Sequence, residues 1–276
     1  MSGKLYIVGT PIGNLLDMSA RAIETMKQCD FIAAEDTRVT VKLLNHFNIK
    51  KPMISYYRHN IETKGKTIID RILSGEDCVL VSDAGMPAIS DPGEELVKEC
   101  ANLGIDIYVV PGPSAVISAL AVSGLPTGRF AFEGFLSVNK KRRIEHLESL
   151  KNEERTMVFY EAPHKLKATL HDLYTTLGDR KISIVREITK IHEEVLRFKL
   201  KDAVEYYDDK NPKGEFVLVI QGASNAIKKE YSLDDAVSMA EELMMQGKSK
   251  SESARIVSRE TNIRKAEIYK QLINKK

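Results

Sequence analysis

The sequence lacks the features of secreted, membrane and zinc-binding proteins. It has only three cysteines, Cys29, Cys78 and Cys100, and no CxxC pair, which argues against a disulfide framework or a zinc knuckle. No apolar run is long enough for a membrane span, and the run near the N-terminus is too short for a signal peptide. The formal net charge is only +2, so a surface for nucleic acid has to be a local patch. We therefore expect a soluble, reduced, cytoplasmic protein.

The motifs of common nucleotide-binding and hydrolytic enzymes are also missing. No GxGxxG follows the first strand pattern and GxxxxGK[ST] does not occur, which excludes the dinucleotide fingerprint and the P-loop. The six histidines form no HExxH pair, and alternation along a strand would send His192 and Glu193 to opposite faces, so no metal site is expected. Ser114 stands in no GxSxG turn. Carboxylates are the chemical groups that remain.

What the sequence does contain is an alternation of strand and helix patterns over its first 125 residues. The strand patterns cover 4–8, 31–35, 53–57, 78–82 and 106–110. The helical patterns cover 19–28, 39–47, 62–74, 93–103 and 114–123. Near-continuous apolar strands separated by helices predict a mostly parallel sheet covered on both faces, with ligands bound outside the carboxyl ends of the strands. The loops of unusual composition at that edge are GTPIGN, EDTR, SDAGMPAISDPG and PGPSA.

The pattern changes after residue 125. Strand patterns cover 130–136, 156–162, 181–188, 194–200 and 214–222, and helical ones 139–150 and 164–177. The run from 181 to 222 reads as strands without helices, which predicts antiparallel pairing and a mixed sheet. The fold class is therefore α/β, with one domain over 1–124 and a second over 125–226. A helical extension over 227–276 has the spacing of a helix-turn-helix, with a small bundle packed on the body as the alternative.

The loops at the sheet edge have the composition of stiff, preformed turns. Prolines fix the backbone and glycines admit a close backbone approach, which suits a bound small molecule. Ser114 opens a helix and could meet an anion there, although a simple helix cap explains it as well. Asp36 and Glu187 stand near strand ends and are each followed by a cation, Arg38 and Lys190. An ion pair at each strand end is the competing interpretation.

Six motifs in the same order resemble the tetrapyrrole methylase family, from residue 4 to about 222. They are VGTPIGNLLDMSARAI, AAEDTRVTVKLL, VSDAGMPAISDPG, VVPGPSAVISALAVSGLPTGRFAFEGFL, VFYEAPHK and REITKIHEE. EDTR, DAGxPxxSDPG, FEGFL and YEAPH are similar to the branch that modifies the 2′-hydroxyl of cytidine in small-subunit ribosomal RNA. The sequence departs from the family in GMP, where threonine commonly precedes the proline, and before Arg129, where an acidic residue is common. Neither departure removes a group that the site needs.

The resemblance implies an S-adenosylmethionine-dependent methyltransferase that acts on 16S rRNA within the small ribosomal subunit, as a homodimer. The cofactor is expected folded in a cleft between the two domains and contacted largely by backbone. The residues implied for it are Pro11, Asp83, Ala84, Gly85, Met86, Ser114, Ala115, Tyr160, Glu161 and Ala162. A methyltransferase of the same fold that acts on a tetrapyrrole or a protein side chain is an alternative. A non-catalytic protein that binds RNA through its helical tail is another.

Methyl transfer to a ribose hydroxyl needs alignment and removal of a proton. Asp36 and Glu187 are the candidate bases by position, with Arg38 and Lys190 to orient a phosphate or to stabilise the alkoxide. Sequence does not decide between the two carboxylates, and positioning alone is a further alternative. The residues predicted to contact RNA are Arg58, His59, Lys140, Lys141, Arg142 and Arg143. For the run from 140 to 143, a solvated helix start is the competing interpretation.

Overall fold

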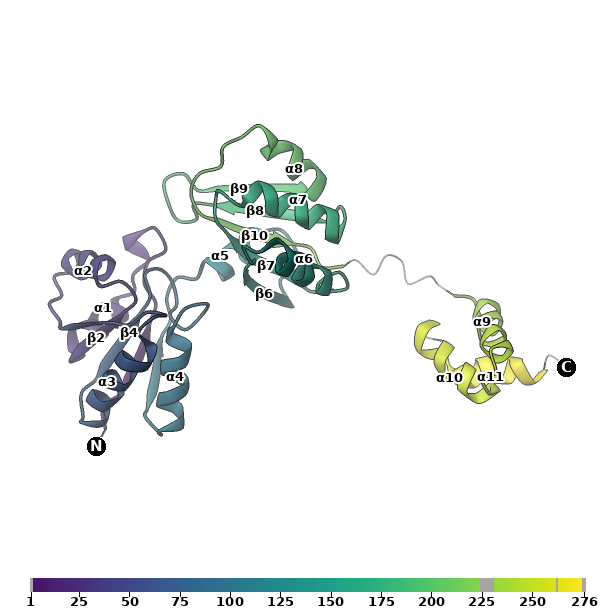
Figure 1. Ribbon diagram of the computed structural model, residues 1–276, viewed down its shortest axis with the longest axis horizontal. Coiled ribbons are helices and arrows are strands. Elements are labelled where there is room, and N and C mark those ends of the chain that lie inside the picture. Colours follow the sequence, from purple (N-terminus) through teal and green to yellow (C-terminus); the bar gives the residue numbers. More distant parts are fainter. Residues whose placement is uncertain (1, 224–230, 262, 275–276) are drawn as a thin grey trace. The chain divides into compact units, whose positions relative to one another are not determined.

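The computed structural model describes residues 2–223, 231–261 and 263–274. The chain forms two compact units, Met1–Gly222 and Ala223–Lys276. In the described residues, the first unit holds two five-stranded sheets with helices on their faces, and the second holds helices alone (Figure 1). None of the helices in the described ranges is both long enough and apolar enough to span a membrane.

The first sheet is parallel and lies between two layers of helices. Its strands are β1 (Leu5–Val8), β2 (Phe31–Ala34), β3 (Met53–Ser55), β4 (Cys78–Val81) and β5 (Ile107–Val110), in the order β3-β2-β4-β1-β5. The helices beside it are α1 (Ala20–Gln28), α2 (Thr37–His46), α3 (Ile61–Leu73) and α4 (Gly93–Asn102), and a short 3₁₀ turn covers Leu15–Asp17. The first two helices pack on one face and the other two on the opposite face. The predicted parallel sheet, covered on both faces, is confirmed.

The central strands are apolar throughout because both of their faces are covered. All four residues of β2 and all four of β4 are buried, as expected for a parallel sheet between helices. The three cysteines lie in this core as free thiols. Burial raises the pKa of Cys29 and of Cys100 to about 11, so neither forms a thiolate at neutral pH.

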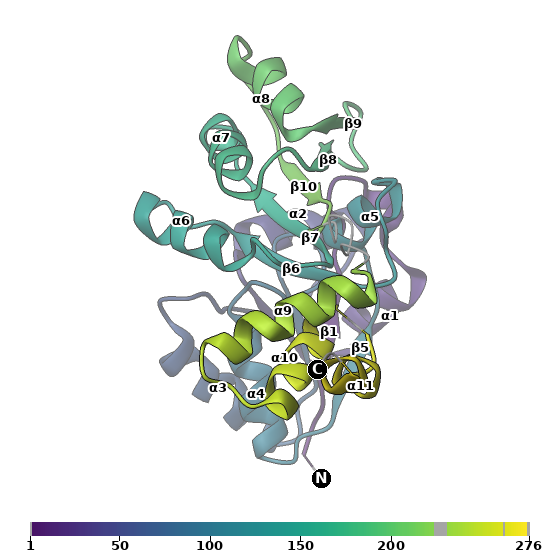
Figure 2. The same ribbon diagram turned by 90° about the vertical axis from the view of Figure 1, so that its right-hand side faces the viewer.

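The second sheet is mixed, as predicted. Its strands are β6 (Phe130–Phe135), β7 (Thr156–Glu161), β8 (Lys181–Arg186), β9 (Glu194–Lys199) and β10 (Phe216–Ile220), in the order β6-β7-β10-β8-β9. Only β6 and β7 pair in parallel, and the other neighbours are antiparallel. One face is covered by α6 (Lys140–Ser149), α7 (Leu166–Leu177) and α8 (Leu200–Asp208). The opposite face is covered by α5 (Ala115–Val122) (Figure 2).

The prediction that 181–222 contains no helix was wrong, because α8 lies between β9 and β10. This helix buries Leu200, Ala203 and Tyr207, which follow each other at helical spacing. Leu200 also completes the apolar pattern of the preceding strand, so the strand pattern conceals the start of the helix. The error leaves the topology intact, since β9 and β10 both still pair antiparallel with β8.

Helix α5 belongs structurally to the second sheet. Val116, Ala119 and Leu120 pack against residues of β7, β8 and β10, and the Arg197 guanidinium donates to the Ser123 carbonyl at the end of the helix. The sequence-based boundary at residue 124 would place this helix in the first domain. We propose instead that the boundary lies in the loop before α5, at 111–114.

The second unit is a small helical cluster with its own core. It contains α9 (Leu233–Met245), α10 (Lys250–Thr261) and α11 (Lys265–Asn274). Its buried residues are Ala236, Val237, Ala240, Ala254, Val257, Ile268 and Leu272. Ser232 and Asp235 cap the start of α9 with reciprocal hydrogen bonds. The predicted extension begins at 227, and residues 224–230 lie outside the described part of the chain.

Candidate active site

Three loops at the carboxyl edge of the first sheet are joined by their backbones. Thr10 and Gly85 exchange two backbone hydrogen bonds of 2.9 and 3.1 Å between the loops after β1 and β4. The loop after β5 packs against the loop after β1 so closely that a Cβ atom on Gly9 would lie 2.7 Å from the Gly112 Cα. The same atom would lie 2.7 Å from the Met86 Sδ, so the loops pack with no room for a side chain at residue 9. The edge is therefore a rigid backbone surface.

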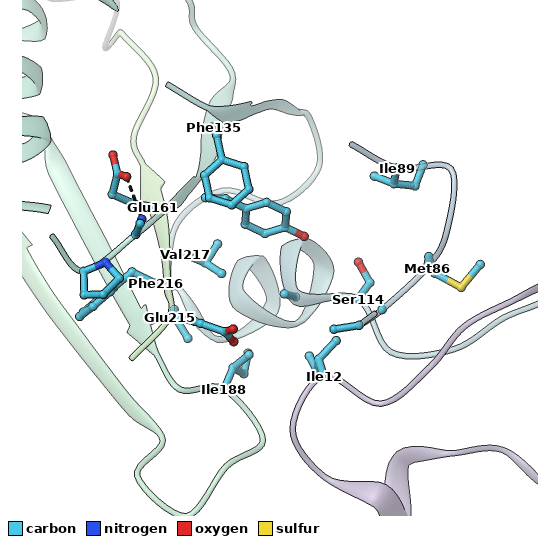
Figure 3. Close-up of a pocket in the computed structure, with 17 residues that line it drawn as sticks. Ile12, Met86, Ile89, Ser114, Phe135, Glu161, Ile188, Glu215, Phe216 and Val217 are labelled. Atoms are coloured by element: carbon cyan, nitrogen blue, oxygen red, sulfur yellow. Dashed lines mark hydrogen bonds between the residues drawn. The ribbon is translucent and has the colours of Figure 1, made fainter. Parts of the chain in front are cut away.

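A cavity of about 420 Å³ lies between this backbone surface and the second sheet (Figure 3). Most of the predicted cofactor-binding residues line it, namely Ala84, Gly85, Met86, Ser114, Ala115, Tyr160, Glu161 and Ala162. Pro11 and Asp83 belong to the same loops but do not line the cavity. The residues that sequence reasoning missed are Ile12, Ile89, Phe135, Pro163, Val185, Ile188, Glu215, Phe216 and Val217. Most of these are apolar residues of strands and loops, whose pattern indicates burial but not which ligand they face.

Gly85 and Ser114 shape the floor of the cavity. Gly85 has a φ of +84°, and a Cβ atom there would lie 3.4 Å from the Ile12 Cγ2 and 3.5 Å from the Pro113 carbonyl oxygen. Only glycine adopts this conformation without strain. The Ser114 hydroxyl accepts a hydrogen bond of 3.5 Å from the Ile117 N–H. Ser114 therefore caps α5, which was the alternative to an anion site. It also faces the cavity, and the two roles are compatible.

Glu161 is a buried carboxylate in the wall of the cavity. It is only 3% exposed, and its two oxygens accept hydrogen bonds from the Ala162 N–H at 2.8 Å and from the Thr169 hydroxyl at 2.5 Å. A buried polar group needs such partners to be tolerated. The carboxylate therefore fixes the backbone turn that follows β7, where YEAPH stands.

Asp36 and Arg38 form the first of the predicted ion pairs. Asp36 caps α2 by accepting from the Arg38 N–H at 2.8 Å, and the Arg38 guanidinium contacts both carboxylate oxygens, with the shortest distance 2.6 Å. Hydrogen bonds from Arg38 lower the pKa of Asp36 to about 2. The Asp36 N–H donates to the Asp83 carboxylate at 3.0 Å, which ties this loop to the cavity floor. Neither Asp36 nor Arg38 lines the cavity.

Glu187 and Lys190 form the second predicted pair, and a third residue joins them. The Lys190 Nζ lies 2.9 Å from the Glu187 Oε1 and 2.9 Å from the Glu215 Oε2. Glu215 lines the cavity, whereas Glu187 and Lys190 do not. The hydrogen bond from Lys190 lowers the pKa of Glu187. Burial lowers the pKa of Lys190, but its bonds to Glu215 and Glu187 outweigh burial and leave that pKa raised.

The Glu187–Lys190 loop also reaches the first sheet. A Cβ atom on Gly13 would lie 2.5 Å from the Lys190 Cγ and 2.9 Å from the Thr189 Oγ1. The absence of a side chain at Gly13 thus lets the GTPIGN loop and the loop after β8 pack directly together. Two loops predicted separately to carry function meet at one edge of the cavity.

The predicted RNA-binding residues divide into two kinds. Arg58 and His59 are exposed after β3, and Lys140, Lys141 and Arg142 are exposed at the start of α6, which leaves all five available to a partner.

Arg143 is different. Its side chain is 12% exposed, and it pairs at 2.7 Å with Asp172 of α7, which is 9% exposed. Its guanidinium also donates to the Ser137 carbonyl at 3.0 Å. Arg143 joins α6 to α7, and we leave it out of the proposed RNA surface.

The sequence profile of the family described as Tetrapyrrole (Corrin/Porphyrin) Methylases matches residues 4–204. The chain belongs to the tetrapyrrole methylase family. Within this family it is 47% identical to the ribosomal RNA small subunit methyltransferase I of a Synechocystis species, over 97% of the chain and 96% of that relative. It is 50% identical to the Thermotoga maritima protein of the same name, over 80% of the chain and 99% of the relative.

Solved structures of tetrapyrrole methylases share the fold of the first unit. The cobalt precorrin-4 methyltransferase superposes with a TM-score of 0.58 at 20% identity, covering 78% of this chain and 94% of that chain. At this identity the likeness concerns the fold alone. It accounts for the arrangement of two α/β sheets that the sequence predicts.

The cavity fits S-adenosylmethionine, the cofactor that membership of the tetrapyrrole methylase family implies. Its volume lies in the range of small-molecule sites, which are mostly apolar with a few placed polar groups. A Cβ atom on Gly85 would contact Ile12, which lines the cavity, so the backbone here comes close to the cavity floor. The residues that would hold the cofactor are Ala84, Gly85, Met86, Ser114, Ala115, Tyr160, Glu161 and Ala162.

Proposed function

We propose that this protein methylates the 2′-hydroxyl of a cytidine in 16S ribosomal RNA, within the small ribosomal subunit and in the cytoplasm. The observation that carries the proposal is the extent of the similarity. The Synechocystis small subunit methyltransferase I matches 97% of the chain at 47% identity, which includes the cavity and the helical unit. A uroporphyrin-III-C-methyltransferase, the cobalt precorrin-4 methyltransferase and a diphthine synthase of known structure are 16–20% identical, so they give no comparable support for a porphyrin or protein substrate.

The chain's own residues have two tasks in such a reaction. When bound, S-adenosylmethionine supplies a methyl group that its sulfonium has already activated. The loops around Thr10 and Gly85 hold the cavity floor in one shape, which favours alignment because little has to be ordered when the reactants bind. The second task is to accept the proton of the ribose hydroxyl, which a nearby carboxylate can do.

We propose the Glu187 side of the cavity for that proton transfer. Glu187 shares Lys190 with Glu215, and Glu215 lines the cavity. The pKa of both carboxylates is lowered, that of Asp36 to about 2. Asp36 is the less suitable base, because Arg38 contacts both of its oxygens, whereas Lys190 and the Glu215 N–H donate to the same oxygen of Glu187. Lys190 keeps its proton because its pKa is raised, so it would stabilise the developing alkoxide. Asp36 and Arg38 then position the loop beside the cavity or an RNA phosphate.

The proposed function predicts which acceptor is labelled. Purified protein and methyl-labelled S-adenosylmethionine should label 16S rRNA in small subunits isolated without this modification, and digestion to nucleosides should give 2′-O-methylcytidine. Uroporphyrinogen and elongation factor are tested in the same assay, because they represent the alternative tetrapyrrole and protein acceptors. Neither should be labelled. Label in the porphyrin or the protein, with none in the rRNA, would contradict the proposal.

The exposed cations of α6 should contribute to binding of the subunit. Replacing Lys140, Lys141 and Arg142 with alanine should weaken subunit binding and reduce the salt slope of log Kd by up to about 2–3, because each phosphate contact contributes roughly 0.7–0.9. Cofactor affinity should stay the same, since these residues do not line the cavity. Binding is measured by filter retention across a salt series.

The matched control for this charge change is a triple alanine variant of Lys27, Lys66 and Lys98. These lysines are exposed on helices that pack against the first sheet. It should keep the wild-type slope. An equal change of slope in both triple variants would show that the α6 cations act only through net charge.

We also propose a homodimer that forms along β5. This strand is the edge of the first sheet, and it exposes Tyr108 and Val109 by 47% and 54%. Ile117 and Val122 of α5 are exposed as well. Exposed apolar edge strands are associated with protein interfaces, which supports a second copy as the partner of this edge.

A further inference from the structure

The FEGFL motif contains a β-bulge that the proposed chemistry has not used. β6 pairs in parallel with β7, and the register passes from Phe132 opposite Val158 to Gly134 opposite Phe159. One extra residue is therefore inserted at Glu133, and Gly134 adopts a φ of +65°. Bulges are rare between parallel strands and are common next to active sites, where they redirect a side chain. We therefore expect this bulge to have a functional role.

The bulge determines the face on which Phe135 lies. Val158 and Tyr160 of β7 point toward α5, whereas Phe159 points toward the opposite core. With the extra residue, Phe135 lies opposite Tyr160 and takes the α5 face, where the cavity is. In a regular strand Glu133 would lie opposite Phe159 and Phe135 opposite Glu161. Phe135 would then take the same face as Phe159, because a shift of one residue moves a side chain to the other face.

Phe135 lies at the rim of the cavity with much of its ring in solvent. It is 60% exposed although it lines the cavity, and its ring centroid is 5.3 Å from that of Tyr160. Ile89, from the loop after β4, lines the same cavity and is 55% exposed. Figure 3 shows the two side chains on the segments that bound the cavity from the two sheets. An aromatic and an aliphatic side chain thus stand uncovered at the rim.

The loop that carries Ile89 is held in a defined shape. Ala88 and Ser90, on either side of Ile89, both have positive φ angles, +67° and +66°, and such conformations persist only where the surroundings enforce them. The Asp91 carboxylate accepts from the Ala88 N–H at 2.8 Å and from the Gly93 N–H at 2.9 Å. A Cβ atom on Gly134 would lie 3.6 Å from the Ser90 Oγ, so the bulge and this loop are neighbours.

We propose that Phe135, with Ile89 on the segment across the cavity rim, is the platform on which the base of the target nucleotide stacks while its ribose enters the cavity. The inference rests on the proposed function. For a ribose to enter the cavity its nucleotide has to leave the RNA helix, and the displaced base then needs a new apolar surface. Aromatic side chains supply that surface for unstacked bases. The exposed cations of α6 begin only five residues after Phe135, so phosphate contacts are available nearby.

The test compares variants of Phe135 in the full-length protein. Phe135→Ala should lower kcat/KM for small subunits by about 5- to 150-fold, the range expected for losing one base–aromatic stack. Phe135→Leu keeps an apolar side chain without the aromatic face and should also be impaired, whereas Phe135→Tyr should restore most of the activity. The Kd of S-adenosylmethionine, measured by calorimetry, should be unchanged in all three. Leu103→Ala is the control, because Leu103 is exposed at the far end of α4.

A second measurement uses the absence of tryptophan from the chain. Phe135→Trp should retain activity and place the chain's single tryptophan at the rim of the cavity. With saturating S-adenosylhomocysteine already bound, addition of subunits should quench this emission relative to wild-type protein in the same mixture. A tryptophan that subunits leave unquenched would contradict stacking.

The remaining outcomes distinguish a failure of the platform from a failure of the proposed function. If Phe135→Ala weakens cofactor binding as much as it lowers kcat/KM, Phe135 belongs to the cofactor wall and the platform is wrong. If Phe135→Leu equals wild type, the residue is only an apolar cover. If the wild-type protein is active and the Phe135→Ala variant is equally active, the platform is wrong and the proposed function is unaffected. If the wild-type protein does not label rRNA, the proposed function is wrong, and the platform, which rests on it, is wrong as well.

Discussion

Glu187→Gln is expected to lower the rate of methyl transfer by at least about a hundredfold at saturating cofactor and subunits, the typical contribution of a positioned base. The amide keeps the size of the side chain and removes the charge that pairs with Lys190. Because the pKa of Glu187 is lowered, the wild-type carboxylate is ionised at neutral pH. The wild-type rate should therefore fall only at a pH below the usual carboxyl range. A single-turnover assay with labelled cofactor measures both quantities.

Controls for this variant come from the other carboxylates. Glu205→Gln removes an exposed carboxylate that pairs with Lys201 on α8, and it should leave the rate unchanged. Asp36→Asn should affect subunit affinity more than turnover, since Asp36 and Arg38 are assigned to positioning. A hundredfold loss in Asp36→Asn with normal turnover in Glu187→Gln would transfer the role of base to Asp36. Normal turnover in both would mean that positioning alone suffices.

Gly85→Val is expected to weaken cofactor binding by at least about tenfold, which corresponds to about 1.4 kcal/mol. The branched side chain would project toward Ile12 and Pro113 at the cavity floor. The substitution should also lower the free energy of unfolding by about 1–3 kcal/mol, because a valine at φ +84° is strained. Calorimetric titration and denaturant unfolding measure the two effects separately.

Gly104→Val is the matched control for this strain. Gly104 has a φ of +69°, and a Cβ atom there would meet nothing within 4 Å. The control should lose a similar amount of stability and keep its cofactor affinity. If the two variants bind the cofactor equally well, the loop after β4 is not the floor of the cofactor site.

The sequence predicted most of the fold because the periodicity of its apolar residues directly reflects which faces are buried. β4 reads as a continuous apolar run because helices cover both of its sides. The loops of the site could be found because glycine, proline and aspartate gather there for reasons of backbone shape. α8 escaped notice because Leu200 also fits the strand pattern before it.

The parts of the site that were missed carry no local signal. Phe216 and Val217 line the cavity, yet they stand in a strand of five buried residues that would read the same against a closed core. Arg143 looks identical to its neighbours in the basic run, and only the packing of α6 on α7 shows that Asp172 neutralises it. Contacts between residues distant in sequence decide such cases.

The packing of α5 determines where the first unit could be divided into two pieces of chain. This helix follows the last strand of the first sheet, but its buried residues Val116, Ala119 and Leu120 rest on the second. A fragment that ended at residue 124 would expose that apolar face to water. A fragment that began at 125 would leave one side of its own sheet bare. A division at residue 124 therefore separates α5 from the sheet that buries it, and the cavity is lined only where both halves are present.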